Sequence, residues 1–580
     1  MELNLHVHQT HLTIGDLIGA VSYIQQNINE EGLHLLPELF LTGYPLQDLC
    51  LQQPFIDSYL VHLELINKWS QKEWKAKNTA ILMGGLNYHF DNNGLPYHIQ
   101  NVVFCLIPGK KLEVVYTKRL LPNYDIFDEQ KYFDEGKENI IWDFNGFKIA
   151  PLICEDMWPS NFYSIDPVEE IRAKAKDGID IIVNLSASPF QIGKLEKRIE
   201  RAKEISEVLS APFLYVNKAG GEDEVLFDGL SFFVENEEVK QVAKAFASHN
   251  FKVQISKNSK TPSGFKTPQT VNTWESLFNP QFDHLNKGVR LKKLSDDELE
   301  STLQALKFGI QEYAKKSGFK KFLVALSGGI DSSLVLTIAH MALEDEQDLE
   351  AIFMPSSFSS TESRELSEQL CQNLGVRLRQ FPIKFLHSNL RTAFADHLSS
   401  PLEGLSDENI QSRLRGMLLY ARSNQTGAMV LNTSNKSELS VGYSTLYGDS
   451  VGAISVLGDL YKTEVFQLAQ YINHKHGHQI PARIIDRPPT AELRDDQTDS
   501  QTLPAYEILD PILEGFLSYR LSPSDIVDLG FSKEVVLKVF NLYQKAEYKR
   551  SQFCPILKLK GKSFGFGYRV PICKTIRDYI

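Results

Sequence analysis

The sequence lacks the features that would place the chain in a membrane or on nucleic acid. It has no apolar run of the roughly 18 residues that a membrane-spanning helix needs, and we expect none. The segment 1–20 has neither a basic start nor a continuous apolar stretch, so we expect no signal peptide. The formal net charge of -12 argues against binding to a nucleic-acid backbone.

Cysteine is also scarce. The six cysteines lie far apart among 580 residues and form no CxxC pair. This spacing is typical neither of a disulfide framework nor of a structural zinc site. A reducing, cytoplasmic location is the simplest interpretation, and it permits a reactive free thiol.

The chain is too long for one ordinary core, so we expect at least two domains. Short Val- and Ile-rich runs alternate with helical segments in both halves, which predicts an α/β fold with sheets covered by helices. A polar stretch with proline and glycine begins at 257, and we predict domains at 1–260 and 295–580 joined by a linker at 261–294. The predicted strands are 79–86, 146–154, 179–185, 212–217, 321–326, 349–354 and 428–432, and the predicted helices are 168–176, 194–209 and 295–316.

Three short segments of the first half each place a reactive side chain at or just beyond an apolar run. They carry Glu38, Lys118 and Cys154. Amide hydrolysis through a thioester needs a thiol nucleophile, a base and a cation or donor for the oxyanion. A lysine beside the thiol favours the thiolate, and a carboxylate in a dry pocket can shuttle protons. Taken singly, each residue is more simply a core cysteine or a surface charge.

The order of these segments resembles the glutaminase domain of the nitrilase superfamily, in the form that is fused to NAD synthetase. The matching segments are LLPELFLTGYPLQDL, YTKRLLPNYDIFDEQKYF, PLICEDMW, NLSASPFQIGK and VNKAGGEDEVLFDGLSF. The resemblance implies an αββα sandwich in which Glu38 is the base, Cys154 the nucleophile and Lys118 the oxyanion stabiliser. It further implies a glutamine pocket with Glu129 as a supporting carboxylate; the pocket residues are Tyr124, Glu129, Glu155, Ser188 and Lys194. For the start of the chain, LNLHVHQTHLTIGDLIG, the family pattern would predict a more apolar first strand.

The second half contains a strand, a glycine turn and a helix start across KFLVALSGGIDSS, residues 321–333. Glycines let the backbone approach an anion, and the N–H groups of the turn and helix start point at it. Ser327 and Ser332 can donate to phosphate oxygens, whereas Asp331 suits a magnesium ligand. The segment lacks the lysine of the GxxxxGK[ST] loop. A lone Gly-Gly pair would be more simply a tight turn.

SGGIDS resembles the pyrophosphate loop of ATP pyrophosphatases, which cleave ATP between the α and β phosphates to adenylate a substrate. Later segments extend the resemblance to the synthetase domain of glutamine-dependent NAD synthetases; they are MPSSFSS, ENIQSRLRG, NTSNKSE, GYSTLYGD, DLYKTEV, PPTAELRDDQTD and EYKRSQ. The final LKLKGKSFGFGYRVPI fits the family end only loosely.

This second resemblance implies a Rossmann-like parallel sheet with adjoining sites for two substrates and a metal. The implied ATP site consists of Ser327, Gly328, Gly329, Ile330, Asp331, Ser332 and Thr433. The implied deamido-NAD site consists of Asn409, Glu438, Asp449, Lys462 and Lys549. Asp331 and Glu438 would hold Mg²⁺, and Arg413 and Arg415 are candidate phosphate partners.

Together the resemblances predict an enzyme with L-glutamine, ATP and deamido-NAD as substrates and an ammonia channel between its sites. They also imply a homo-oligomer built on a dimer of synthetase domains. Three alternatives remain open: an amidotransferase acting on another acid, a scaffold with an inactive first half, and an amidase with an ATP-sensing module. An assay with deamido-NAD, and the formation of AMP in step with glutamate, would distinguish them.

Overall fold

The computed structural model describes residues 2–575 apart from positions 161, 259, 263–290, 292, 344–348, 399, 478, 495–496 and 498–500. The chain divides into two compact units, Met1–Phe278 and Asn279–Ile580. Most of the predicted linker at 261–294 lies outside the described residues. Among the helices described, none is long and apolar enough to cross a bilayer.

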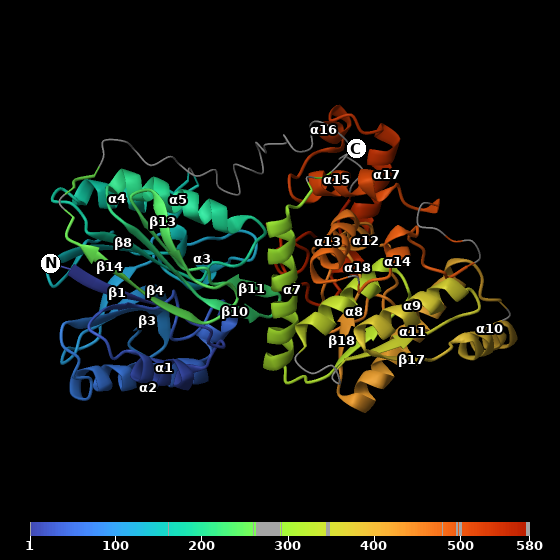
Figure 1. Ribbon diagram of the computed structural model, residues 1–580, viewed down its shortest axis with the longest axis horizontal. Helices are drawn as coiled ribbons and strands as arrows, with labels where there is room; N and C mark the ends of the chain where they lie inside the picture. Colours follow the sequence, from blue (N-terminus) through green and yellow to red (C-terminus); the bar gives the residue numbers. More distant parts are fainter. Residues whose placement is uncertain are drawn as a thin grey trace. The chain divides into compact units, whose positions relative to one another are not determined.

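Within its described residues, the first unit forms two six-stranded sheets with helices on their outer faces (Figure 1). The first sheet has the order β14-β1-β2-β3-β4-β5 and the second β13-β12-β9-β8-β7-β6. The strands of the first sheet are β1 (Glu2–Gln9), β2 (Gly32–Leu35), β3 (Thr79–Phe90), β4 (Pro96–Leu106), β5 (Glu113–Thr117) and β14 (His249–Ser256). Those of the second are β6 (Trp142–Phe144), β7 (Phe147–Ile153), β8 (Ile181–Ser186), β9 (Phe213–Asn217), β12 (Phe232–Glu235) and β13 (Glu238–Val242).

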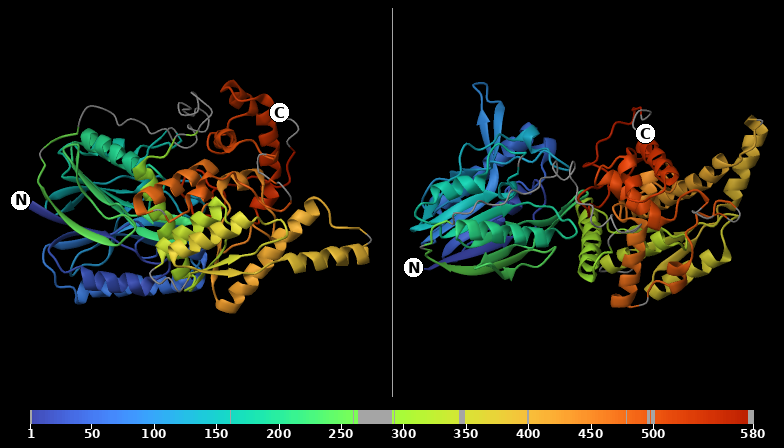
Figure 2. Two further views of the ribbon diagram at one scale, coloured as in Figure 1. Left: turned by 45° about the vertical axis from the view of Figure 1, so that its right-hand side comes forward. Right: turned by 90° about the horizontal axis from the view of Figure 1, so that it is seen from above.

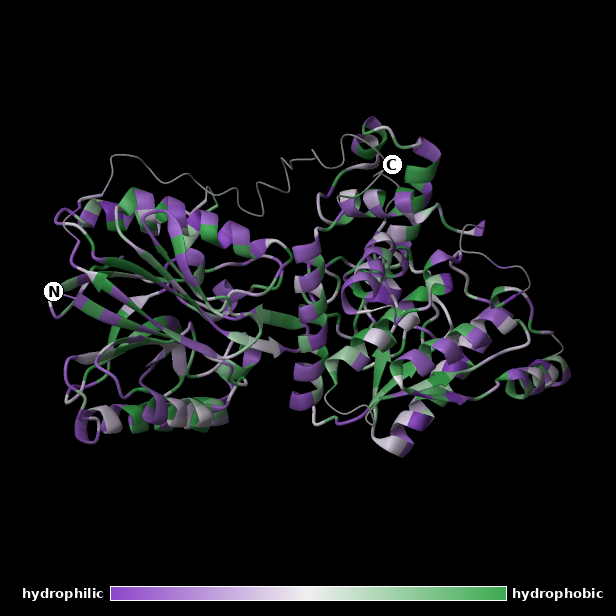
Figure 3. Cartoon of the chain, viewed as in Figure 1, coloured by the Kyte–Doolittle hydropathy of each residue, from purple (hydrophilic) through white to green (hydrophobic). Residues whose placement is uncertain are grey.

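Apolar side chains fill the space between the two sheets and the space beneath each helical layer. Leu5 and Val7 of β1 pack in one core with Ile149 and Val183 of the facing sheet. Helices α1 (Leu17–Asn27) and α2 (Gln53–Lys72) cover the first sheet, and α4 (Pro167–Lys174) and α5 (Lys194–Leu209) cover the second. Figure 3 shows the hydrophobic strands enclosed by helices whose outer faces are hydrophilic. This arrangement confirms the predicted αββα sandwich.

The first strand is more polar than the family pattern would predict, because apolar and polar side chains alternate along it. Leu3, Leu5 and Val7 point into the core between the sheets. On the opposite face, the His6 ring stacks on His34 of β2 at a centroid distance of 4.3 Å, and His8 Nε2 lies 2.9 Å from His34 Nδ1. Period-two alternation therefore lets one face of β1 be apolar while the other carries histidines.

In the described part of the second unit, a five-stranded sheet is parallel throughout, with the order β17-β16-β15-β18-β19. Its strands are β15 (Phe322–Ala325), β16 (Leu349–Phe353), β17 (Arg377–Gln380), β18 (Met429–Asn432) and β19 (Ile454–Ser455). This confirms the predicted Rossmann-like sheet. The strand order reverses between β15 and β18, and ligands of open α/β sheets bind at the carboxyl ends of strands beside such a switch point.

The described helices of the second unit are α7 (Asp296–Lys316), α8 (Ile330–Ala342), α9 (Thr361–Leu374), α10 (Lys384–Leu398), α11 (Leu405–Thr426), α12 (Lys436–Val441), α13 (Lys462–His476), α14 (Ala482–Asp486), α15 (Tyr506–Leu517), α16 (Pro523–Asp528), α17 (Lys533–Lys545) and α18 (Glu547–Arg550). The start of α7 is as predicted: Ser295 and Glu298 form a reciprocal capping box. Helix α10 stands at the outer edge of its unit in every view (Figures 1 and 2).

The carboxyl-terminal segment extends the parallel sheet beyond β19. Ser455 N–H donates to Pro555 O at 2.8 Å, and Leu557 N–H donates to Ser455 O at 3.2 Å. Asp459 then accepts hydrogen bonds from the N–H groups of Leu559 and Lys560. The part of this segment from Ile556 to Leu559 is therefore buried in the second unit.

Candidate active sites

In the first unit, the three candidate catalytic residues each lie within three residues of the end of a strand. Glu38 comes after β2, Lys118 after β5 and Cys154 after β7. In the first sheet, β2 is parallel to β3, and β4 is antiparallel to both β3 and β5, so the loops after β2 and β5 leave the same edge. Cys154 follows β7 of the second sheet. The scaffold is rigid, so side chains on these loops are held in place.

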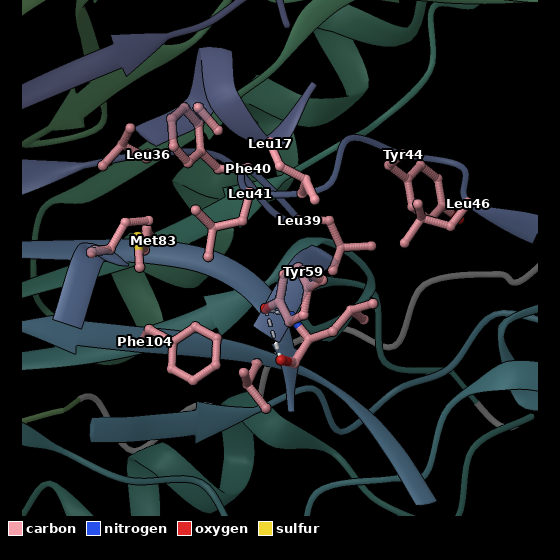
Figure 4. Packing of buried hydrophobic residues seen from close by; sticks show 14 of the residues in the cluster. Leu17, Leu36, Leu39, Phe40, Leu41, Tyr44, Leu46, Tyr59, Met83 and Phe104 are labelled. Carbon is pink, nitrogen blue, oxygen red and sulfur yellow. Dashed lines mark hydrogen bonds between the residues drawn. The ribbon is translucent and has the colours of Figure 1, made fainter. Parts of the chain in front are cut away.

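The loop that carries Glu38 is fixed by apolar packing and by backbone contacts to β3. Leu39 and Leu41 pack in the same cluster as Met83 and Phe104 (Figure 4). Gly84 N–H donates to the Pro37 carbonyl at 3.1 Å. A Cβ at Gly84 would lie 2.2 Å from the Leu39 nitrogen, so the close approach of loop and strand requires glycine.

Glu38 and Lys118 form a buried network, each with a relative exposure of 1%. Glu38 Oε1 accepts hydrogen bonds from Lys118 Nζ and Asn101 Nδ2, both at 2.8 Å, and Oε2 accepts from the Ala187 N–H at 2.9 Å. Lys118 Nζ also donates to Glu129 Oε1 at 2.8 Å. Burial opposes the ammonium charge, but Glu129 and Glu38 outweigh it and raise the pKa of Lys118 well above its usual value. The lysine therefore stays protonated.

Cys154 begins the short 3₁₀ helix η2 (Cys154–Met157) with a left-handed φ of 43°. Burial raises the pKa of its thiol, and the charge of Glu38 raises it further, whereas Lys118 lowers it. Lys118 thus lowers the pKa of the thiol, as expected from the sequence, but burial and Glu38 raise this pKa by more. The resting thiol is protonated and needs a base, which Glu38 can supply.

A second group of predicted residues gathers next to Cys154. Glu155 accepts hydrogen bonds from the Tyr124 hydroxyl at 3.1 Å and from the Tyr163 hydroxyl at 2.9 Å. Burial raises the pKa of Glu155 to about 7. Lys194 is the first residue of α5, and burial lowers its pKa to about 8, although the charges of Cys154 and Glu155 raise it. The pocket therefore contains an acidic and a basic group whose charges depend on pH near neutrality.

The remaining two predicted pocket residues are held by different partners. Ser188 donates its N–H to Asn217 Oδ1 at 2.8 Å, and its hydroxyl accepts from Arg198 at 3.1 Å. Glu129 contacts Lys118 and accepts from the Tyr44 hydroxyl at 3.0 Å. Glu129 thus belongs to the lysine network, as its implied supporting role requires.

In the second unit, the SGGIDS loop follows β15 and leads into α8. The Ser327 and Ser332 hydroxyls lie 3.0 Å apart, and the Gly329 N–H donates to Ser327 Oγ at 3.2 Å. Gly328 has a φ of 80°, and a Cβ on it would lie 2.4 Å from the Ser363 carbonyl. The turn is built so closely against α9 that only glycine fits at this position.

Two predicted metal ligands and a predicted substrate lysine meet beside this loop. Asp331 accepts hydrogen bonds from Asn435 Nδ2 at 2.9 Å and from Lys462 Nζ. Lys462 Nζ also lies 3.5 Å from Glu438 Oε1. Asn435 caps the helix that carries Glu438, through a capping box. One cationic group therefore lies between two carboxylates at the switch point of the sheet.

Three other residues predicted to bind deamido-NAD lie around the loop 442–449; they are Asn409, Asp449 and Lys549. Thr445 donates its hydroxyl to Asn409 Oδ1 at 2.8 Å and its N–H to Asp449 Oδ1 at 2.6 Å. Lys549 Nζ donates to the carbonyls of Gly442 and Ser444, at 2.7 and 2.6 Å.

The remaining predicted residues of the second unit are Arg413, Arg415 and Thr433. Arg413 Nε donates to Leu446 O and Arg415 Nε to Met354 O, at 3.2 and 2.9 Å. Burial lowers the pKa of Arg415 to about 10. Thr433 follows β18 and is half-buried. Within the described ranges, no set of three or more His, Cys, Asp and Glu side chains is arranged as a metal site.

Comparison with known proteins gives two family profiles and many full-length relatives. The carbon-nitrogen hydrolase profile matches residues 11–244, and the NAD synthase profile matches residues 302–553. The glutamine-dependent NAD(+) synthetase of Aquifex aeolicus is 35% identical, with 98% of this chain and 99% of the relative covered. That of Thermotoga maritima is 34% identical, with 99% of each covered. The chain belongs to the glutamine-dependent NAD(+) synthetase family.

Solved structures of glutamine-dependent NAD(+) synthetases have the same fold along nearly the whole chain. The enzyme of Acinetobacter baumannii, in complex with ADP, matches with a TM-score of 0.69 and 29% identity, covering 99% of this chain and 98% of that one. The enzyme of Cytophaga hutchinsonii matches with a TM-score of 0.76 at 19% identity, covering the same shares, which supports the fold alone.

Several residues at the glutaminase site were not predicted from the sequence of this family member. Asn101 and the Ala187 N–H hold Glu38, Tyr44 holds Glu129, and Tyr163 holds Glu155. Asn101 is a fully buried polar residue in the apolar strand β4, and this pattern could have drawn attention to it. A backbone N–H such as that of Ala187 gives no sequence signal.

Proposed function

We propose that the first unit hydrolyses L-glutamine and that the second uses the ammonia, with ATP, to convert deamido-NAD to NAD. The observation that carries the proposal is the buried network of Glu38, Lys118 and Glu129, whose charges act on the Cys154 thiol. The family relationship covers both halves of the chain and supports coupled activities. We keep 1–260 and 295–580 as the proposed limits of the two catalytic domains.

In the glutaminase reaction, Glu38 takes the Cys154 proton as the thiolate attacks the side-chain amide carbon of glutamine. Lys118 and the Glu155 N–H stabilise the negative charge on the tetrahedral oxygen. Glu38 returns the proton to the leaving nitrogen, ammonia departs, and a thioester remains. Glu38 then takes a proton from water as the water oxygen attacks the thioester carbonyl. The carbon–sulfur bond breaks, glutamate is released, and Glu38 returns the proton to the Cys154 sulfur.

Glutamine recognition follows from the charges beside the nucleophile. Ionised Glu155 suits the α-ammonium group of a free amino acid, and Lys194 suits its α-carboxylate. Tyr124 and Tyr163 hold the Glu155 carboxylate in one orientation. We therefore propose that the pocket selects a free amino acid over an uncharged amide.

In the synthetase reaction, the nicotinate carboxylate of deamido-NAD attacks the α-phosphorus of ATP, and pyrophosphate leaves. The N–H groups and serine hydroxyls of the SGGIDS loop bind the departing pyrophosphate. Ammonia then attacks the acyl-adenylate carbonyl and AMP leaves, which gives the carboxamide of NAD. The residues proposed to bind deamido-NAD are Asn409, Glu438, Asp449, Lys462 and Lys549, and Thr433 is proposed to contact ATP.

The residues at the loop fit a magnesium site. Asp331 and Glu438 supply the oxygen ligands that Mg²⁺ prefers, and both already lie close to one cation, the Lys462 ammonium. Mg²⁺ bound with ATP would neutralise charge on the phosphates.

We also propose a symmetric homo-oligomer built on a dimer of synthetase domains. Helices α10 and α11 expose large apolar side chains, including Phe385 at 76% and Leu405 at 72% relative exposure. Exposed apolar groups on neighbouring helices are typical of an association surface. Light scattering on the purified protein would measure the subunit number, and a monomer at assay concentrations would contradict this proposal.

One assay tests the function: purified protein with ATP, Mg²⁺ and deamido-NAD, supplied with either glutamine or ammonium. We expect NAD and AMP in equal amounts from both nitrogen sources, with glutamate formed only from glutamine. Glutamate without AMP would indicate an amidase with an ATP-sensing module or an amidotransferase for another acid, and repeating the assay with other acids in place of deamido-NAD would separate these two. No turnover at all would indicate a scaffold.

A further inference from the structure

A buried carboxylate two residues beyond the candidate nucleophile connects two loops of the glutaminase site. Asp156 lies in η2 and has a relative exposure of 0%. Its Oδ1 accepts from the Leu120 N–H at 2.8 Å and the Arg119 N–H at 3.1 Å. Its Oδ2 accepts from the Ile153 N–H and the Tyr116 hydroxyl, both at 2.9 Å.

These donors lie next to two of the proposed catalytic residues in the sequence. Arg119 and Leu120 follow Lys118 directly, and Ile153 precedes Cys154 directly. Backbone hydrogen bonds to one carboxylate thus join the lysine loop to the cysteine turn. A carboxylate that accepts several N–H bonds is a strong and directional anchor.

The cysteine turn needs such an anchor because its backbone is strained. Cys154 has a φ of 43°, a left-handed conformation that is unfavourable for a non-glycine residue. Strained residues keep their conformation only where the surroundings over-determine it. The bond from the Ile153 N–H to Asp156 closes the turn around Cys154.

We propose that Asp156 is a positioning residue that sets the Cys154 thiol relative to Lys118. It acts through the backbone of both loops. This inference rests on the proposed glutaminase function. If the proposal is correct, loss of Asp156 uncouples the lysine from the thiol without removing either group.

Asp156→Asn is the most informative substitution because it keeps the size of the side chain. The amide oxygen of the asparagine can still accept hydrogen bonds from the backbone N–H groups of one loop. The amide NH₂ group faces an N–H donor of the other loop and cannot accept a hydrogen bond from it. A misplacement of about 1 Å can cost about 10²-fold in rate. We expect the glutaminase kcat to fall by about 10²-fold, the KM for glutamine to change by less than about threefold, and ammonium-dependent NAD synthesis to be unchanged.

A second readout separates positioning from general destabilisation: the pH profile of Cys154 alkylation by iodoacetamide, followed on the Cys154 peptide by mass spectrometry. Lys118 lowers the pKa of this thiol. If Asp156→Asn uncouples the two, the midpoint of the profile moves to higher pH. Unfolding would instead expose the thiol and move the midpoint to lower pH, because the burial that raises its pKa would be lost.

Asp180→Asn is a matched control in the same unit. Asp180 is also buried, and its carboxylate accepts from the Lys148 N–H at 2.7 Å and the Asn258 N–H at 2.6 Å. Neither partner belongs to the loops of Lys118 or Cys154. We expect a loss of stability similar to that of Asp156→Asn, with kcat and the alkylation midpoint unchanged.

A wild-type kcat and midpoint in Asp156→Asn would overturn the inference, and so would a loss of activity that only matches the loss of folded protein. If Asp156→Asn does not fold, Tyr116→Phe removes one of the bonds to Oδ2 and should shift the midpoint in the same direction by less. An unchanged midpoint in that variant would also overturn it. A wild-type protein that releases no glutamate from glutamine would contradict the proposed function instead.

Discussion

Burial is the main cause of the pKa shifts of Cys154 and of the ionisable residues next to it. Burial raises the pKa of the Cys154 thiol and that of Glu155, and it lowers the pKa of Lys194. Each of these shifts favours the neutral form, as desolvation requires. Lys118 is the exception because two carboxylates bind it. The pocket thus keeps one fixed cation for the oxyanion and holds groups that change charge near neutral pH.

The pH dependence of glutamine binding follows from Glu155. Its pKa is raised to about 7, so the carboxylate gains a proton as the pH falls through that value and stops attracting the ammonium group of glutamine. We expect the KM for glutamine to rise between about pH 8 and pH 6, while kcat changes less. Steady-state kinetics across this range would measure it.

Tyr163→Phe provides the matched variant. The Tyr163 hydrogen bond lowers the pKa of Glu155, so its removal should move the rise in KM to higher pH. A KM that is independent of pH in both proteins would show that Glu155 does not bind the substrate's ammonium group.

Secondary-structure elements were the part of the fold that the sequence predicted best. Helix α5 has its predicted bounds, and β3, β7, β8 and β9 overlap the predicted strands. The pairing of strands was not predictable from the residues alone, because β1 pairs with β14 about 250 residues away. The motif residues were predicted because their segments resemble known families, whereas Asn101, Tyr163 and Asp156 act through contacts that form only when distant segments meet.

The glycine turn between β15 and α8 can be tested with a matched pair of glycines. Gly328 and Gly318 have similar φ values, 80° and 77°, but only Gly328 has no room for a Cβ. We expect Gly318→Ala to lose about 1–2 kcal/mol of unfolding free energy through the left-handed conformation, and Gly328→Ala to lose more because its Cβ also meets the Ser363 carbonyl. Only Gly328→Ala should reduce NAD synthesis, by about 10²-fold with either nitrogen source. Equal activity of the two variants would contradict a role of this turn in binding phosphate.

The histidines of β1 and β2 predict an acid-sensitive packing of the first sheet. Burial lowers the pKa of His8 to about 3 and that of His34 to about 4, from 6.5. Below about pH 6.5 the unfolded chain binds protons that the folded unit does not, so the free energy of unfolding falls as the pH falls from about 6.5 toward 4. The five tryptophans all precede residue 279, so their fluorescence reports on this unit. His8→Leu should make the decline shallower, and an unchanged slope would contradict this account.

Over the whole molecule, the two proposed reactions belong to two units that each have a core of their own. The glutaminase residues all lie in Met1–Phe278, and the residues proposed for ATP and deamido-NAD all lie in Asn279–Ile580. A substitution in one site should therefore leave the other chemistry intact. Nitrogen source is the variable that separates them, since ammonium salts bypass the glutaminase.

The most direct test compares Cys154→Ala with Asp331→Ala in the coupled assay. We predict that Cys154→Ala forms no NAD from glutamine and synthesises NAD from ammonium at the wild-type rate. Asp331→Ala should form no NAD from either nitrogen source and should still hydrolyse glutamine. Glutamine-dependent synthesis by Cys154→Ala, or synthesis from ammonium by Asp331→Ala, would contradict the assignment of the two sites.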